Sequence, residues 1–150
     1  MMRKAINEAL KQAMKSREKV RIATLRLINA AITDRDIEER SKGRDGISND
    51  EIMAVLAKMI RQREESAKIY EENGRLEMAE QERQEIQVIS DFLPAQMDED
   101  DIKACCREVV EETGAQGLRD MGKCMATLKE RYPGQIDFGQ ASTVVKGMLN

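Results

Sequence analysis

Apolar residues recur every three to four positions along nearly the whole chain, with charged residues between them. The segment RKAINEALKQAMK, residues 3–15, places Ile6, Leu10 and Ala13 on one side and lysines on the opposite side. This spacing is typical of an amphipathic helix that buries one face. No segment shows the strict alternation of a half-buried strand, so the pattern predicts an all-α fold.

Three further helices are predicted before Pro94, the first proline of the chain. The segment VRIATLRLINAAI, residues 20–32, is apolar almost all round, which predicts a central helix touched by several neighbours. Ser48 and Glu51 have the spacing of a capping box and therefore open the next helix. The segment at residues 75–90 then returns as its antiparallel partner. We expect an N-terminal domain of about four helices over residues 1–93.

Pro94, within the segment DFLPAQM, marks a change in the pattern. Proline disfavours helical backbone at the residue before it, and the predicted helices after it are shorter. Residues 94–96 are therefore predicted to form a linker, and residues 97–150 a small C-terminal tail domain of three helices. Asp98 and Asp137 are the predicted N-caps of the first and third tail helices.

The charge is uneven along the chain, although the net value is only -3. Residues 1–31 hold eight basic and two acidic residues, whereas residues 32–97 carry a net charge of -6 and residues 98–150 one of -3. The acidic total argues against indiscriminate binding to nucleic acid, and we expect no binding to DNA. The basic segment permits a focused contact, although solvated helix surface is the simpler interpretation of charge alone.

The composition also favours a cytoplasmic protein that is not inserted in a membrane. Charged residues make up 35% of the chain, and no apolar run approaches the length that crosses a bilayer. No charged and then apolar leader is visible at the start. We therefore expect a cytoplasmic protein that does not associate with membranes.

Residues suited to catalysis are sparse. The chain has no histidine and no P-loop, dinucleotide or nucleophile-elbow motif. The acidic cluster at residues 98–101 fits the first turn of a helix better than a metal site. Cys105, Cys106 and Cys124 match neither a disulfide framework nor a zinc pair, and Cys124 is expected to be a packing residue. We expect no cofactor, no metal and no autonomous enzyme.

Three longer segments carry a resemblance to a known family. The segments ATLRLINAAI, RQREESAKIYEENGRLEMAEQERQEIQVISDFLPAQM and GAQGLRDMGKCMATL together resemble the GatB/YqeY family over essentially the whole chain. The resemblance implies an N-terminal helical domain and a three-helix tail. It also implies a relation to the C-terminal part of the B subunit of the glutamine-dependent tRNA amidotransferase, whose tail helps to hold tRNA while catalysis occurs elsewhere.

The resemblance has functional implications that rank in a definite order. It implies tRNA as a partner, and an aminoacyl-tRNA synthetase or an amidotransferase as a protein to assist. Free-standing members are commonly labelled as carbon-nitrogen ligases with glutamine as amido-N-donor. That activity ranks last here, because the sequence shows no nucleophile, ATP site or ammonia channel. A helical adaptor that binds only protein, without RNA, is the main alternative to the tRNA-binding accessory module.

The segment MGKCM, residues 121–125, contains a glycine that its own helix does not need. The apolar face of this predicted helix consists of Leu118, Met121, Cys124, Met125, Leu128 and Tyr132. Gly122 lies at the polar edge, where it and Ala126 form an almost bare stripe beside basic residues. A phosphate backbone could approach such a stripe closely and meet positive charge.

The last helix repeats this arrangement with Gly139, Thr143, Lys146 and Gly147 on its outward side. The candidate RNA-binding residues are Arg119, Gly122, Lys123, Lys129, Lys146 and Gly147. The alternative interpretation is that both bare stripes let the helices pack closely against the N-terminal domain or a partner. The near absence of aromatic residues argues against base stacking, so an RNA contact should read shape and phosphate.

Overall fold

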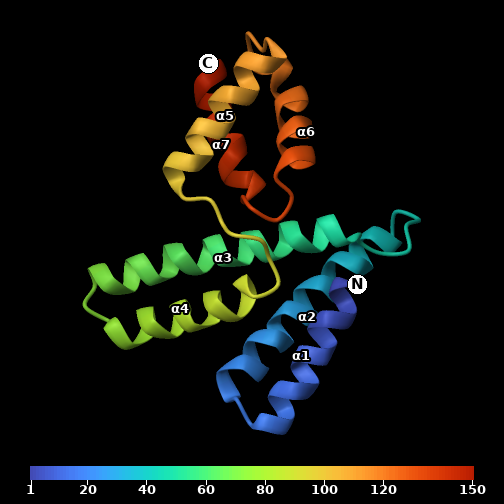
Figure 1. The fold of residues 1–150 in the computed structure, drawn as a ribbon, viewed down its shortest axis with the longest axis vertical. Coiled ribbons are helices and arrows are strands. Elements are labelled where there is room, and N and C mark those ends of the chain that lie inside the picture. Colours follow the sequence, from blue (N-terminus) through green and yellow to red (C-terminus); the bar gives the residue numbers. More distant parts are fainter. The chain divides into compact units, whose positions relative to one another are not determined.

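The computed structural model describes residues 1–150 and contains seven α-helices, one short 3₁₀-helix and no strand, which confirms the all-α fold class (Figure 1). The elements are α1 (Met2–Ser16), α2 (Lys19–Arg40), α3 (Asn49–Glu72), α4 (Leu76–Ser90), α5 (Glu99–Thr113), η1 (Leu118–Asp120), α6 (Met121–Arg131) and α7 (Phe138–Leu149). The helices fall into two compact units, Met1–Pro94 and Ala95–Asn150. That residues 1–93 and 97–150 behave as separate domains around a linker stays a prediction.

The N-terminal unit (Met1–Pro94) consists of two helical hairpins. Helix α1 packs on α2, α3 lies along α4, and α2 also contacts both helices of the second hairpin. The core between them is aliphatic, because the buried stripe of each helix meets the others there. Its fully buried members include Ile6, Leu25, Ile28, Ile52, Leu56 and Ile89.

Helix α2 differs in part from its predicted environment. It touches several neighbours as expected, and Leu25, Ile28 and Ile32 are buried. Val20 and Leu27, however, are exposed. The three neighbouring helices cover only one side of α2, so the apolar residues of its other side face solvent.

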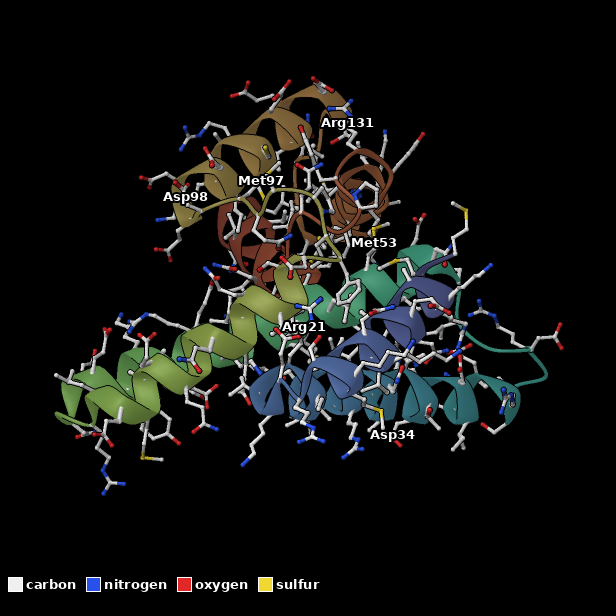
Figure 2. The ribbon with its side chains drawn as sticks, turned by 60° about the horizontal axis from the view of Figure 1, so that its bottom comes forward. Arg21, Asp34, Met53, Met97, Asp98 and Arg131 are labelled. Atoms are coloured by element: carbon white, nitrogen blue, oxygen red, sulfur yellow. The ribbon has the colours of Figure 1, made fainter.

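Capping side chains begin the helices where the sequence predicts them. The Glu51 backbone N–H donates to Ser48 Oγ at 3.2 Å, and the Ser48 backbone N–H donates to Glu51 Oε1 at 3.2 Å, which completes the capping box. Asp98 and Asp137 accept from backbone N–H groups of the first turns of α5 and α7. Asp98 is visible at the start of α5 in Figure 2.

A partly buried ion pair, between the exposed Arg3 and the buried Asp36, joins the first turn of α1 to α2 and to the loop before α3. Arg3 donates from both terminal nitrogens to Asp36, at 2.6 and 2.7 Å. The same carboxylate accepts from the Ile47 backbone N–H at 2.9 Å, and Arg3 also donates to the Ile47 carbonyl at 2.8 Å. These bonds lower the pKa of Asp36 to about 2, with the hydrogen bond from Arg3 as the largest cause.

Candidate nucleic-acid interface

The C-terminal unit (Ala95–Asn150) is a three-helix bundle in which α5, α6 and α7 all pack on one another. Its core is made of Ile102, Cys106, Val109, Cys124, Leu128, Ile136, Ala141, Val145 and Leu149. The chain before α5 is tied to the turn before α7, because the Met97 backbone N–H donates to the Gln135 carbonyl at 3.1 Å. The Gln96 side chain donates to the Gly134 carbonyl at 2.5 Å. These two bonds hold the entry to the bundle against its last turn.

The bundle divides its charge between an acidic and a basic part of the chain. Residues 95–112, which include α5, hold seven acidic and two basic residues. Residues 113–150, which include α6 and α7, hold five basic and three acidic residues. Arg131 is paired with Glu112 of α5. The other four cations of α6, α7 and η1 have no carboxylate oxygen within the 4.0 Å of an ion pair.

Gly122 and Gly147 have open space where a side chain would be. Both are exposed, and a Cβ added to either would meet no heavy atom within 4 Å. The packing of this chain therefore does not require the small size of either residue. Gly122 lies in the first turn of α6, where glycine costs less than in the middle of a helix.

Two of the candidate lysines also have contacts inside the bundle. Lys123 Nζ donates to the carbonyl of Thr113 at 3.3 Å, at the end of α5, where a cation complements the negative end of the helix dipole. Lys129 Nζ lies 5.9 Å from the centre of the Phe138 ring, within the range of a cation–π contact. Because Phe138 begins α7, this contact also places the end of α6 beside the start of α7.

Helices α6 and α7 run in opposite directions (Figure 1). The start of α6, with Gly122 and Lys123, and the end of α7, with Lys146 and Gly147, consequently lie toward the same end of the bundle. Arg119 is exposed in η1 directly before α6. The structure thus gathers five of the six candidate residues toward one end, and leaves Lys129 toward the other.

One predicted position is wrong, and one glycine that faces outward as predicted has less open space than Gly122. Leu118 does not belong to the apolar face of the α6 helix. It lies in η1 and is 47% exposed, because α6 begins only at Met121. Gly139 is not open in the way that Gly122 is. A Cβ on Gly139 would lie 3.3 Å from an oxygen of Asp137, since that carboxylate folds over the first turn of α7 as its cap.

The three cysteines are free and belong to the bundle core or its border. Cys106 and Cys124 are fully buried, which confirms Cys124 as a packing residue, and Cys105 is half-buried. Burial is the largest cause that raises the pKa of Cys106, to about 11. No group of three or more Cys, Asp or Glu side chains is arranged to hold a metal. No helix combines the length and the apolar character needed to cross a bilayer.

Sequence reasoning missed two hollows of the N-terminal unit. One, of about 670 Å³, lies between the start of α2 and α4, where Arg21 forms a 3.2 Å ion pair with Asp91. Arg21 is labelled in Figure 2. The other, of about 490 Å³, lies at the turn between α1 and α2 and has a basic rim. Apolar residues outside the buried faces, such as Met14, were the only sequence signal for the second hollow.

The chain is a small all-α protein of two compact helical units. Exposed lysines and glycines of the second unit form its candidate binding surface. The chain belongs to the YqeY-like protein family, whose model matches residues 3–149. The family resemblance stated from the sequence is thereby confirmed.

Fungal relatives are similar over much of the chain. A protein of Kluyveromyces lactis named "Altered inheritance of mitochondria protein 41, mitochondrial" is 26% identical over 135 residues, which cover 89% of this chain and 68% of the relative. The protein of the same name in Eremothecium gossypii is 29% identical over 90 residues, 60% of this chain and 48% of the relative. An uncharacterized protein of Schizosaccharomyces pombe is 31% identical over 90 residues, 59% of this chain and 69% of the relative. The match thus spans about half of the Eremothecium relative.

Proposed function

We propose that this protein is a tRNA-binding accessory module that assists an aminoacyl-tRNA synthetase or an amidotransferase. The observation that carries the proposal is the open space at Gly122 and Gly147 beside the unpaired Lys123 and Lys146. Nothing within this chain uses the small size of these glycines, so their bare surface is available to a partner. A phosphate backbone is the partner that would use both the close approach and the positive charge.

The chemistry of the surface favours contacts with phosphate over contacts with bases. Aromatic residues make up only 3% of the chain, so few platforms exist on which bases could stack. The contact of Lys123 with the Thr113 carbonyl occupies one of the three donors of its ammonium group, which leaves two for a phosphate. We infer recognition of tRNA by shape and backbone charge, without base readout.

Fewer observations support the two alternative functions. A protein–protein adaptor would use the same bare stripes for close helix packing, and it has no need of the lysines. Carbon-nitrogen ligase activity with glutamine as amido-N-donor rests on the family resemblance alone and ranks third. A cytoplasmic location remains a prediction, since the two relatives with a descriptive name are called mitochondrial.

Fluorescence anisotropy with total tRNA at two salt concentrations tests the proposal. The double variant Lys123→Glu with Lys146→Glu is expected to bind more weakly and to lower the salt slope by about two, because each lost phosphate contact lowers the slope by about one. The matched control is Lys103→Glu with Arg107→Glu, which makes the same change of charge at exposed positions of α5. This control is expected to affect binding far less.

A bulk substitution separates the two leading functions. Gly122→Leu is expected to weaken tRNA binding by its size, with the fold checked by circular dichroism. Unchanged affinity and salt slope in the double lysine variant would remove the tail from RNA binding and leave the segment Arg3 to Arg26 as the candidate. The absence of salt-sensitive tRNA binding at micromolar protein would favour the protein–protein adaptor. For an adaptor, Gly122→Leu should disrupt a protein complex, and the lysine substitutions should matter little.

A further inference from the structure

The N-terminal unit exposes large apolar side chains at two separate corners, which Figure 1 shows as the α1–α2 turn and the α3–α4 turn. The first corner carries Met14 and Val20, and the second carries Ile69, Leu76 and Met78. These five are more than half of the nine large hydrophobic residues that the whole chain exposes. Their gathering at two corners is more specific than the scattered exposure that a protein surface normally shows.

The two corners carry opposite charge. Residues 11–27, at the α1–α2 corner, hold six basic residues and one acidic residue. Residues 69–82, at the α3–α4 corner, hold five acidic residues and one basic residue. One acidic residue of the second corner, Glu71, is already paired with Arg83. Glu72 and Glu77 are exposed beside Leu76 and form no ion pair within the chain. Glu80 instead lines the hollow between α2 and α4, together with Lys19 of the same chain.

The basic corner is hollowed, whereas the acidic corner projects. The hollow of about 490 Å³ is lined by Met14, Arg17, Lys19, Ile22, Ala23 and Arg26. It combines an apolar floor with a rim of three cations. Leu76 is 67% exposed, the most of any large apolar residue after the chain-terminal Met1, and it stands at the tip of the acidic hairpin.

Arg17 holds an unfavourable backbone conformation at the rim of this hollow. Its φ of 57° is the only positive value among the residues that are not glycine. The residue after a helix often takes this conformation, in which the Glu18 backbone N–H reaches the Ala13 carbonyl at 3.1 Å, and glycine is the residue that adopts it most readily. Glycine would therefore serve the turn better, so the arginine at this place indicates a use for its guanidinium.

We propose that the α1–α2 corner binds the α3–α4 corner of a second copy of this chain, with Leu76 in the hollow and the neighbouring glutamates against Arg17, Lys19 and Arg26. Both halves of the contact are present on every copy, and they match in charge and in apolar character. If each pair of copies shares one such contact, the contact is heterologous and builds rings or open chains of copies. If two copies exchange both corners at once, they form a closed symmetric pair. The proposal concerns the N-terminal unit and does not rest on the proposed binding of tRNA.

Sedimentation velocity over a range of protein concentrations tests this proposal in the absence of RNA. In low salt the weight-average mass is expected to rise above the 17.0 kDa of one chain as the concentration increases. High salt should return it toward one chain, because exposed charges are screened. A mass of 17.0 kDa at every concentration in low salt would overturn the proposal.

Arg17→Gly is the most informative single substitution. It removes a rim cation and supplies the residue that the positive φ favours, so the fold should be at least as stable as before. Association is nevertheless expected to weaken by about tenfold. Lys4→Gln removes one exposed positive charge at the other end of α1 and serves as the control, for which association should be unchanged. Equal association of Arg17→Gly and the wild type would contradict the proposed contact.

A charge-reversal pair tests which surfaces meet. One variant carries Arg17→Glu and Arg26→Glu, and the other carries Glu72→Lys and Glu77→Lys. Each alone is expected to remain a single chain, because like charges then face each other. Their mixture should associate again, since the two reversed corners match each other and the two unchanged corners also match. A mixture that does not associate would overturn the pairing. A second result would also overturn it: a chain that never self-associates but binds tRNA in a salt-sensitive way, with Arg17→Gly abolishing that binding.

Discussion

The ion pair between Arg3 and Asp36 gives the most quantitative prediction for this protein. Asp36→Asn keeps the shape of the side chain but removes its charge. The Asp36 side chain is 8% exposed and accepts hydrogen bonds from both Arg3 and the Ile47 backbone N–H. The NH₂ group of an asparagine at this position would therefore face a group that also donates. We expect the variant to fold and to be less stable.

The pKa of Asp36 sets the size of this effect. Its value of about 2 lies below the ordinary 3.8, and one pKa unit corresponds to about 1.4 kcal/mol, so the charge contributes on the order of 2 kcal/mol at neutral pH. The Arg3 side chain is 43% exposed, and solvent screening therefore reduces the expected loss to about 1–2 kcal/mol.

The same pKa fixes the pH dependence. Because the folded pKa of Asp36 lies below the unfolded one, the folded state binds fewer protons, and the stabilisation is complete above about pH 5. It is lost as the pH falls through 3.8 toward about 2. The Arg44 guanidinium also lowers the pKa of Glu51 to about 2, so the wild type loses stability from both groups. The difference between wild type and Asp36→Asn isolates the contribution of Asp36.

Urea unfolding followed by circular dichroism, from about pH 7 to about pH 2, measures this difference. Asp34→Asn is the matched control, because it makes the same chemical change on an exposed residue of α2 that has no ion-pair partner (Figure 2). It should alter stability by less than about 0.5 kcal/mol. The reasoning is refuted if Asp36→Asn matches the wild type near neutral pH, or if its deficit persists unchanged at about pH 2.

Three further predictions concern backbone space, domain structure and thiol reactivity. In urea unfolding, Gly122→Ala should stabilise the protein by up to about 0.5 kcal/mol, because an added Cβ has open space there. Gly46→Ala should destabilise the protein, because the φ of Gly46 is 151° and an added Cβ would lie 2.8 Å from Oδ1 of Asp36. A fragment of residues 1–96 should melt cooperatively by circular dichroism, and a gradual melt would contradict the two-domain interpretation. Iodoacetamide should label Cys105 before Cys106, as measured by mass spectrometry, because Cys105 is half-buried and Cys106 is fully buried. Equal labelling rates of the two thiols would contradict the burial of Cys106.

The sequence alone determined the features of this protein that depend on neighbours along the chain. The helical class follows from the spacing of apolar residues, and the helix starts at Asn49, Glu99 and Phe138 follow from capping side chains within three residues. Both signals act locally, so no knowledge of tertiary contacts is needed to read them. The placement of Gly122 at the polar edge of its helix follows in the same way.

The candidate surface was only partly contained in the sequence. Spacing along the helix put Gly122 and Gly139 in equivalent stripes, but an added Cβ has open space at the first and meets Asp137 at the second. Lys123 is exposed, and its ammonium group also reaches the Thr113 carbonyl at the end of another helix, a contact that helical spacing does not predict. These outcomes depend on which atoms arrive from elsewhere in the fold, and helical periodicity does not report them.

Tertiary structure decided what brings distant residues together. The pairing of Arg3 with Asp36 and Ile47 joins positions more than 30 residues apart, and no local pattern distinguishes Arg3 from the other cations of its helix. The hollow beside Arg17 exists because α1 and α2 meet at a turn with a positive φ, and the open side of α2 exists because its three neighbours all pack on the other side. Periodicity identifies which residues of a helix share a face, whereas the packing of the other helices determines which of those faces is buried.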